Sequence, residues 1–197
     1  MISVAQAQKS VIDNAALLPK QKVELSASSN QFLAQDIIAP ISLPPFRQSA
    51  MDGYAFIYDA HCTSLKVVGK VQAGAVEVPK LKKGEAIRIF TGAAVPAEAD
   101  TVIIQEHTKS EGDQLLIEKL PAKGANIRPI GEQIEKGNVV LKQGHQVNEA
   151  SIGFLAGLGL TEIEVYRKPK VAVLMTGDEL QAPGSELKPN HIYESNG

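Results

Sequence analysis

The sequence contains a single cysteine, Cys62, no tryptophan, and only 5% aromatic residues. One cysteine cannot form a disulfide within the chain, and it cannot complete a cysteine-based zinc site. An excess of positive charge is also missing, since 20 lysines and arginines stand against 22 aspartates and glutamates. Because this balance supplies no basic field to hold a phosphate backbone, we expect no general nucleic-acid binding.

Long hydrophobic runs are absent as well. The longest nearly apolar stretch, 152–160, is too short to span a bilayer and contains three glycines. The residues after Met1 lack the apolar region of a signal peptide. What remains is an ordinary globular composition, with 44% hydrophobic and 21% charged residues among 197. We therefore expect a protein without a membrane segment, located in the cytoplasm.

The N-terminal part of the chain predicts helix first and strand later. Ser3 and Gln6 have the spacing of a capping box, and apolar residues recur at three and four positions over 4–18. This pattern predicts a helix that the following proline ends. A second, shorter helix is expected over 19–26, and a strand over 32–38.

The next hundred residues change character. Pro44-Pro45 mark a boundary, because a residue before proline is pushed out of the helical region. Short β-like runs separated by glycine, proline and asparagine follow, and they predict a small β-barrel or sandwich. The candidate strands are 54–58, 65–71, 86–90, 101–105, 115–117 and 139–141.

The C-terminal part returns to helical patterning and then poses a problem. Asn148 is a good N-cap for a helix over 149–156, and 162–166 alternates as a half-buried strand. The almost continuously apolar run 170–175 fits a strand of a parallel sheet that is covered on both faces. Such a strand needs a neighbour delivered by a crossover of a dozen or more residues, and the proline-containing segment 176–197 does not complete one. We therefore interpret the chain as the N-terminal part of a longer protein.

The densest unusual stretch is 49–55, which contains Asp52-Gly53. A carboxylate on a tight turn could be presented to a metal ion or another ligand. The alternative is an ordinary Asp-Gly turn entering a strand, with Met51 and Tyr54 in the core. The residues alone leave both interpretations open.

Two further loops could meet an anion. Thr91-Gly92 follows a predicted strand, and free backbone N–H groups there could bind a phosphate. Arg128 stands beside a glycine turn and could hold an anion bidentately. The alternatives are a structural turn at Thr91 and a solvated surface arginine at Arg128.

The segment 176–180 would lie at the carboxyl end of the apolar strand, where open α/β sheets bind ligands. Asp178 and Glu179 in that position suit Mg²⁺ beside a substrate phosphate. The alternative is that both carboxylates open the next helix, favoured by its dipole. The four histidines have no metal-ligand spacing.

Several ordered motifs together resemble one family, the molybdopterin molybdenumtransferases (MoeA), which are similar to the gephyrin E domain. The resemblance covers essentially the whole chain. The motifs that carry it are 44–55, 89–96 and 99–106, followed by 126–128, 131–132, 171–180 and 192–196.

The resemblance implies a mixed α and β multidomain fold. An elongated, discontinuous α+β domain would comprise 1–44 and 139–168, with the helix over 1–18 packing on an α/β domain. An all-β, barrel-like domain would be inserted at 45–138. The segment 169–197 would be the first strand and loop of a truncated α/β domain that binds molybdopterin.

The resemblance also implies a reaction, the insertion of molybdate into adenylyl-molybdopterin with Mg²⁺ and release of AMP. Asp52 and Glu179 are the implied catalytic residues and Mg²⁺ ligands, and Thr91 would shape the wall of the pocket. The implied substrate-binding residues are Thr91, Asp178, Arg128 and Gln133. A homodimer is expected, with molybdopterin adenylyltransferase as a possible partner.

Two departures from the family pattern qualify this expectation. Gln133 stands where the family usually has aspartate, so a charge-dependent role at that position is in doubt. The Gly-Gly-Val-Ser and Pro-Gly-Asn-Pro loops of the α/β domain are missing from the chain, so we expect these 197 residues alone to be inactive. The alternative function is a non-catalytic dimerising or scaffold module of the gephyrin type.

Overall fold

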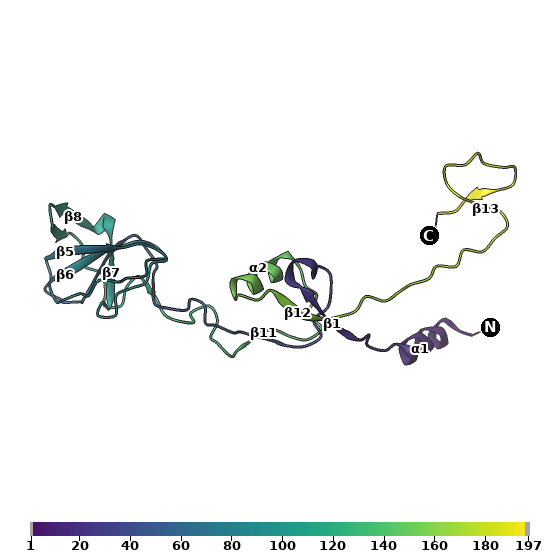
Figure 1. The fold of residues 1–197 in the computed structure, drawn as a ribbon, viewed down its shortest axis with the longest axis horizontal. Helices are drawn as coiled ribbons and strands as arrows, with labels where there is room; N and C mark the ends of the chain where they lie inside the picture. Colours follow the sequence, from purple (N-terminus) through teal and green to yellow (C-terminus); the bar gives the residue numbers. More distant parts are fainter. Residues whose placement is uncertain (1, 196–197) are drawn as a thin grey trace. The chain divides into compact units, whose positions relative to one another are not determined.

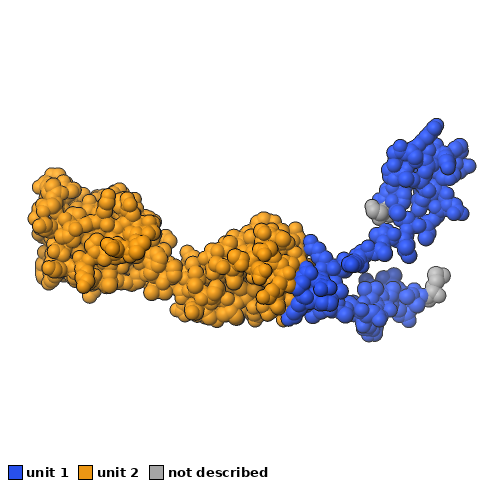
Figure 2. All heavy atoms as spheres, in the orientation of Figure 1, with its two compact units in different colours: residues 1–21, 166–197 blue, residues 22–165 orange. Residues whose placement is uncertain are grey.

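A computed structural model describes residues 2–195, so Met1 and the Asn196 that ends the last family motif lie outside the described residues. The chain divides into two compact units, Met1–Gln21 with Tyr166–Gly197 (unit 1) and Lys22–Val165 (unit 2), coloured separately in Figure 2. Figure 1 shows that the described part is mostly β-structure with two α-helices. The elements are α1 (Val4–Asn14), β1 (Lys20–Glu24), η1 (Leu25–Ala27), β2 (Ile37–Ile38), β3 (Gln48–Ser49), β4 (Gly53–Phe56), β5 (Ser64–Val71), β6 (Glu85–Ile89), β7 (Thr101–Ile104), η2 (Gln105–His107), β8 (Thr108–Glu111), β9 (Gln114–Ile117), β10 (Ile127–Arg128), β11 (Val139–Leu141), α2 (Glu149–Gly157), β12 (Glu162–Tyr166), β13 (Leu180–Gln181) and β14 (Ile192–Tyr193).

The largest sheet is a curled six-stranded one with the order β7-β4-β6-β5-β9-β8 (Figure 1). β5 and β6 run in parallel, and the other neighbouring strands are antiparallel. Successive residues of a strand point to opposite faces, and two apolar clusters accordingly cover the sheet from its two sides. Ala55 belongs to one cluster and Phe56 to the other, both fully buried.

The register of this sheet brings distant loops to one end. β4 lies between β6 and β7, and its first residue, Gly53, is opposite both Ile89 and Ile104. Because both pairings are antiparallel, the residue before β4 lies beside the residues that follow β6 and β7. Those three positions are Asp52, the loop that contains Thr91, and Gln105.

A separate core forms around α2. It contains Leu33, Leu155 and Val165, each completely buried, together with residues of η1 and β2. Asn148 caps α2 as expected, since its side chain accepts a hydrogen bond from the Ser151 N–H at 2.9 Å.

The first helix begins as the sequence predicts. Ser3 and Gln6 form both hydrogen bonds of the capping box, at 3.2 and 2.8 Å. The helix ends at Asn14 rather than at Leu18, and Ala15 is already extended. Its residues are not buried, so the expected packing of this helix on an α/β domain stays a prediction.

The predicted helix over 19–26 is wrong. Residues 20–24 instead form β1, which pairs with β12, and a 3-10 turn follows at Leu25–Ala27. The Leu25 N–H also donates to the Thr161 carbonyl at 2.8 Å. A partner strand some 140 residues later along the chain therefore overrides the local helical pattern. The predicted strand over 32–38 is shorter than expected, with only Ile37–Ile38 as β2 and single bridges at Phe32 and Leu33.

The predicted parallel strand over 170–175 is also wrong. The segment carries no regular structure, and Val171 and Leu174 are 78% and 88% exposed. A doubly buried strand needs neighbours on both edges and cover on both faces, which the described residues do not supply. The described part of 169–197 contains a short parallel pair, β13 with β14, and its assignment to an α/β domain stays a prediction.

In the six-stranded sheet, β8 is the one strand that the sequence did not predict; the two-residue strands β3, β10, β13 and β14 elsewhere in the described residues were not predicted either. β8 pairs with β9 in a hairpin, but its sequence Thr-Lys-Ser-Glu has no buried residue. The apolar alternation that reveals a strand is therefore absent. The domain boundaries at 44/45 and 138/139 stay predictions.

Candidate functional site

The candidate site is built on the backbone at the start of β4. The Asp52 carbonyl accepts a hydrogen bond from the Gln105 N–H at 3.1 Å, and the buried Ser49 hydroxyl donates to the Met51 carbonyl at 2.6 Å. Met51 itself is 43% exposed, so it is not the core residue that the turn interpretation expected. These bonds fix the backbone from which the Asp52 side chain projects.

Glycine is required at position 53 because there is no room for a side chain, not because of a turn. A Cβ atom at this position would lie 1.9 Å from the carbonyl oxygen of Ile103, on the neighbouring strand. Its φ is not among the positive values found at the glycine turns of the chain. The Asp-Gly pair therefore marks a close approach of two backbones, whereas both interpretations of the sequence assumed a tight turn here.

Asp52 and Thr91 form the central contact of the site. The Thr91 backbone N–H and hydroxyl both donate to Asp52 Oδ1, each at 2.8 Å. Both hydrogen bonds lower the pKa of the exposed Asp52 carboxyl below its ordinary value, and the bond from the Thr91 backbone has the larger effect. The positive charge of Arg88 also lowers this pKa. The structure thus brings together two residues that the sequence analysis singled out separately.

The loop at Thr91 is not a phosphate-binding nest. Its successive N–H groups already have acceptors inside the protein: Thr91 donates to Asp52, Gly92 to the Ser49 carbonyl at 2.9 Å, and Ala93 to the Phe90 carbonyl at 2.9 Å. These backbone N–H groups are therefore not free to bind an anion, and Thr91 as a substrate-binding residue stays a prediction.

Arg88 is a residue of this site that the sequence analysis missed. It is opposite Tyr54 on β4, and its guanidinium lies 5.2 Å from the Tyr54 ring centre and 4.7 Å from that of Phe90. It donates to the Gly53 carbonyl at 2.8 Å and to Gln105 Oε1 at 2.5 Å. An arginine in the middle of the otherwise apolar strand Ala-Ile-Arg-Ile-Phe was the available signal.

Arg128 and Gln133 lie together elsewhere in unit 2. They line a small cavity of about 140 Å³ with Gln48 and the proline pair at 44–45. Arg128 is opposite Gln48 in the β3–β10 pairing, and the Gln133 N–H donates to the Leu43 carbonyl at 2.9 Å. Both side chains are exposed, so they are available to a polar ligand.

Asp178 and Glu179 belong to unit 1, whereas Asp52 and Thr91 belong to unit 2. Both are exposed in a turn that enters β13, and the Glu179 carbonyl accepts from the Ile192 N–H at 2.9 Å. The alternative in which they open a helix is wrong, because a short strand follows.

Within residues 2–195, no group of three or more histidine, cysteine, aspartate or glutamate side chains is arranged to hold a metal ion. Neither helix in that range is long and apolar enough to cross a membrane.

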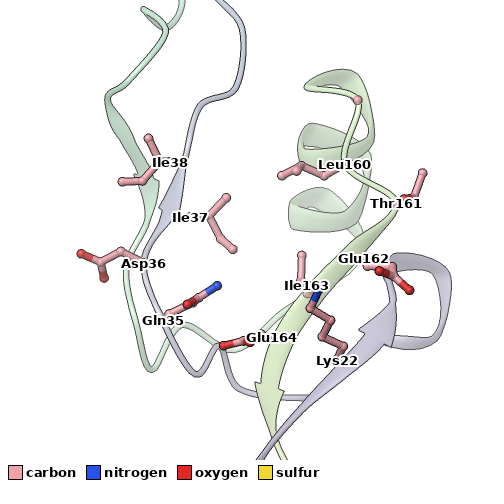
Figure 3. Close-up of a pocket in the computed structure, with 11 residues that line it drawn as sticks. Lys22, Gln35, Asp36, Ile37, Ile38, Leu160, Thr161, Glu162, Ile163 and Glu164 are labelled. Atoms are coloured by element: carbon pink, nitrogen blue, oxygen red, sulfur yellow. The ribbon is translucent and has the colours of Figure 1, made fainter.

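A second cavity, of about 570 Å³, is larger than the one beside Arg128 and Gln133 and lies between β2 and β12 (Figure 3). Its lining includes Lys22, Asp36 and Glu164 but none of the predicted site residues.

Comparison with known proteins places the chain among one set of relatives. It is 39% identical over 200 residues to the molybdopterin molybdenumtransferase of Haemophilus influenzae, covering 100% of this chain and 50% of that protein. It is 36% identical over 203 residues to the enzyme of the same name from Staphylococcus aureus, covering 100% of this chain and 48% of the relative. The crystal structure of the molybdopterin biosynthesis MoeA protein from Pyrococcus horikoshii OT3 superposes with a TM-score of 0.90 at 34% identity, over 100% of this chain and 54% of that one.

The chain thus spans about half the length of the curated relatives it matches. A family model described as the MoeA N-terminal region (domain I and II) matches residues 2–159, a range that includes Asp52, Thr91, Arg128 and Gln133. With the ordered motifs and the fold agreeing over that range, the chain belongs to the MoeA family.

Proposed function

We propose that the full-length protein inserts molybdate into adenylyl-molybdopterin and releases AMP, as part of molybdenum cofactor biosynthesis. The observation that carries the proposal is the Asp52–Thr91 contact, which lies within two of the family motifs and orients an exposed carboxylate. The printed names of the relatives, molybdopterin molybdenumtransferase, supply the reaction.

The Asp52 carboxylate fits a magnesium ion. Its pKa is lowered, so it is ionised at neutral pH, and both internal hydrogen bonds use the same oxygen, Oδ1. Mg²⁺ is commonly bound in proteins by one or two carboxylates together with substrate phosphates, so an exposed and oriented carboxylate is a suitable ligand. The ion would neutralise charge on the pyrophosphate as AMP leaves.

The roles of the chain's own residues follow from this arrangement. Asp52 would hold the cation through Oδ2 and orient the pyrophosphate, while Thr91 keeps the carboxylate in one rotamer. Glu179 is proposed as a carboxylate that binds Mg²⁺, with Asp178 as its neighbour. Arg128 and Gln133 would contact polar groups of the substrate, with Gln133 contributing hydrogen bonds but no charge.

We also propose that the protein acts as a homodimer in the cytoplasm, with molybdopterin adenylyltransferase as a candidate partner that supplies the adenylylated substrate. The alternative, a non-catalytic scaffold module of the gephyrin type, finds no support in the relatives described above. Those relatives are named as transferases.

The test uses the full-length protein with adenylyl-molybdopterin, and AMP release is measured with and without molybdate and Mg²⁺. We expect release that requires both. Asp52→Ala should lower it at least as much as the ~10- to 100-fold that is usual for a residue supporting a metal ligand, while the protein stays folded at the assay temperature. Asp113→Ala is the matched control, because Asp113 is an exposed carboxylate in the turn between β8 and β9, paired only loosely with Lys66 at 3.8 Å. Molybdate-independent release, or equal activity of the two variants, would contradict the proposal.

A further inference from the structure

We propose that Arg88 is a positioning residue for the Asp52 carboxylate, an inference that rests on the proposed function. Arg88 acts on the backbone and side chains around Asp52 rather than on the substrate. The Arg88 guanidinium contacts all three strand ends that meet at the site.

The Arg88 guanidinium donates three hydrogen bonds. Nη1 donates to the Gly53 carbonyl at 2.8 Å and to the Ile89 carbonyl at 3.1 Å, and Nη2 donates to Gln105 Oε1 at 2.5 Å. These acceptors belong to the start of β4, the end of β6 and the residue after β7. One side chain therefore holds together the three segments that carry Asp52, Thr91 and Gln105.

The hydrogen bonds of Arg88 and Gln105 reach the backbone at Asp52. The Gln105 side chain is bonded to Arg88, and the Gln105 backbone N–H donates to the Asp52 carbonyl at 3.1 Å. The next carbonyl along the chain, that of Gly53, is bonded to Arg88 directly. Both peptide groups that follow the Asp52 Cα are thus fixed, which sets the direction in which its side chain leaves the backbone.

The Arg88 side chain has little conformational freedom. It is half-buried, and the rings of Tyr54 and Phe90 lie against its guanidinium at 5.2 and 4.7 Å. A planar fork held in this way donates from two separate nitrogens in fixed directions, which the single ammonium nitrogen of lysine cannot do. Replacement of Arg88 by lysine would keep the charge near Asp52 and lose the geometry.

We therefore expect Arg88→Lys in the full-length protein to raise the Mg²⁺ concentration for half-maximal AMP release about 10- to 100-fold, the usual effect of removing a residue that supports a metal ligand. The KM for adenylyl-molybdopterin should change less than the Mg²⁺ requirement. Gln105→Met should produce a similar effect, and the double variant should be no worse than the poorer single one, because both break the same network.

Arg47→Lys is the matched control. Arg47 also donates to backbone carbonyls, those of Pro96, Ala97 and Ala99 at 2.9 to 3.0 Å, but its network does not include Asp52. A purely structural arginine should lower the unfolding temperature and leave the Mg²⁺ requirement unchanged, which is the result expected for Arg47→Lys. The same result for Arg88→Lys would overturn the inference.

A second readout does not depend on the reaction. The amide proton resonance of Thr91 reports its hydrogen bond to Asp52 Oδ1. We expect this resonance to move in Arg88→Lys and to stay in place in Arg47→Lys; an unmoved resonance in both would refute the positioning role. If the wild-type protein releases no AMP, the proposed function fails, and the Thr91 resonance still decides whether Arg88 positions Asp52.

Discussion

Substitution of Gly53 by alanine provides a sharp test of how the site is built. The added Cβ would lie 1.9 Å from the Ile103 carbonyl oxygen, 2.8 Å from its carbonyl carbon and 3.0 Å from Ile104 Cα. All three are backbone atoms of β7, so no side chain can rotate away to relieve the contact. To reach even 3.0 Å from the oxygen, β4 and β7 must separate locally by about 1.1 Å.

The cost of Gly53→Ala has two parts. Overpacking a well-packed interior costs about 1–3 kcal/mol, and each backbone hydrogen bond lost from the β4–β7 pairing adds about 0.5–1.5 kcal/mol. Loss of one or two such bonds gives a total of about 1.5–6 kcal/mol. This is a large fraction of the 5–15 kcal/mol that is typical of a folded domain.

Urea unfolding of wild type and variant, followed by circular dichroism, measures the difference in free energy of unfolding. Gly153→Ala is the control, because Gly153 lies inside α2 and, apart from its chain neighbours and the backbone of its own helix, nothing lies within 4 Å of its Cβ position. That change should stabilise the protein by up to about 1 kcal/mol. A Gly53→Ala variant that loses less than about 1 kcal/mol would show that the two strands do not approach as closely as described.

The remaining predictions concern Asp52, α2 and η1. Thr91→Val removes the hydroxyl bond to Asp52 and should raise the Asp52 pKa, measured by NMR titration of the carboxyl carbon; an unchanged pKa would contradict the assigned contact. Because the folded pKa is depressed, the Asp52 contribution to stability is present above the ordinary pKa of 3.8 and is lost as the pH falls through the folded value, so Asp52→Asn should flatten the acid side of the stability profile. Asn148→Ala removes the cap of α2 and should cost about 1 kcal/mol in thermal or urea unfolding, whereas Asn148→Ser should largely restore it. Leu25→Ala, at a residue only 5% exposed, should cost about 2–5 kcal/mol, and a loss no greater than that of an exposed leucine such as Leu17 would contradict the assigned core.

Local signals predicted those elements whose stabilising contacts lie close in the sequence. The capping box at Ser3 and Gln6 and the cap at Asn148 each close over three residues, so they are visible before folding. Alternating apolar residues likewise revealed β12, because one face of that strand is buried, and short β-like runs between turn residues revealed β5 and β6. The helix predicted over 19–26 and the strand predicted over 170–175 failed because partners from elsewhere decide both, β12 in the first case and cover on both faces in the second.

The sequence by itself determined the family, the helix caps, most strands of the six-stranded sheet, and the candidate residues Asp52 and Thr91. Only the tertiary structure decided that these two residues touch, that Gly53 is required by a neighbouring carbonyl, and that Arg88 joins the segments around them. The contacts responsible connect residues 39 positions apart for Asp52 and Thr91, and 35 apart for Arg88 and Gly53. Contacts of that separation depend on strand order and register, which a local pattern of residues does not contain.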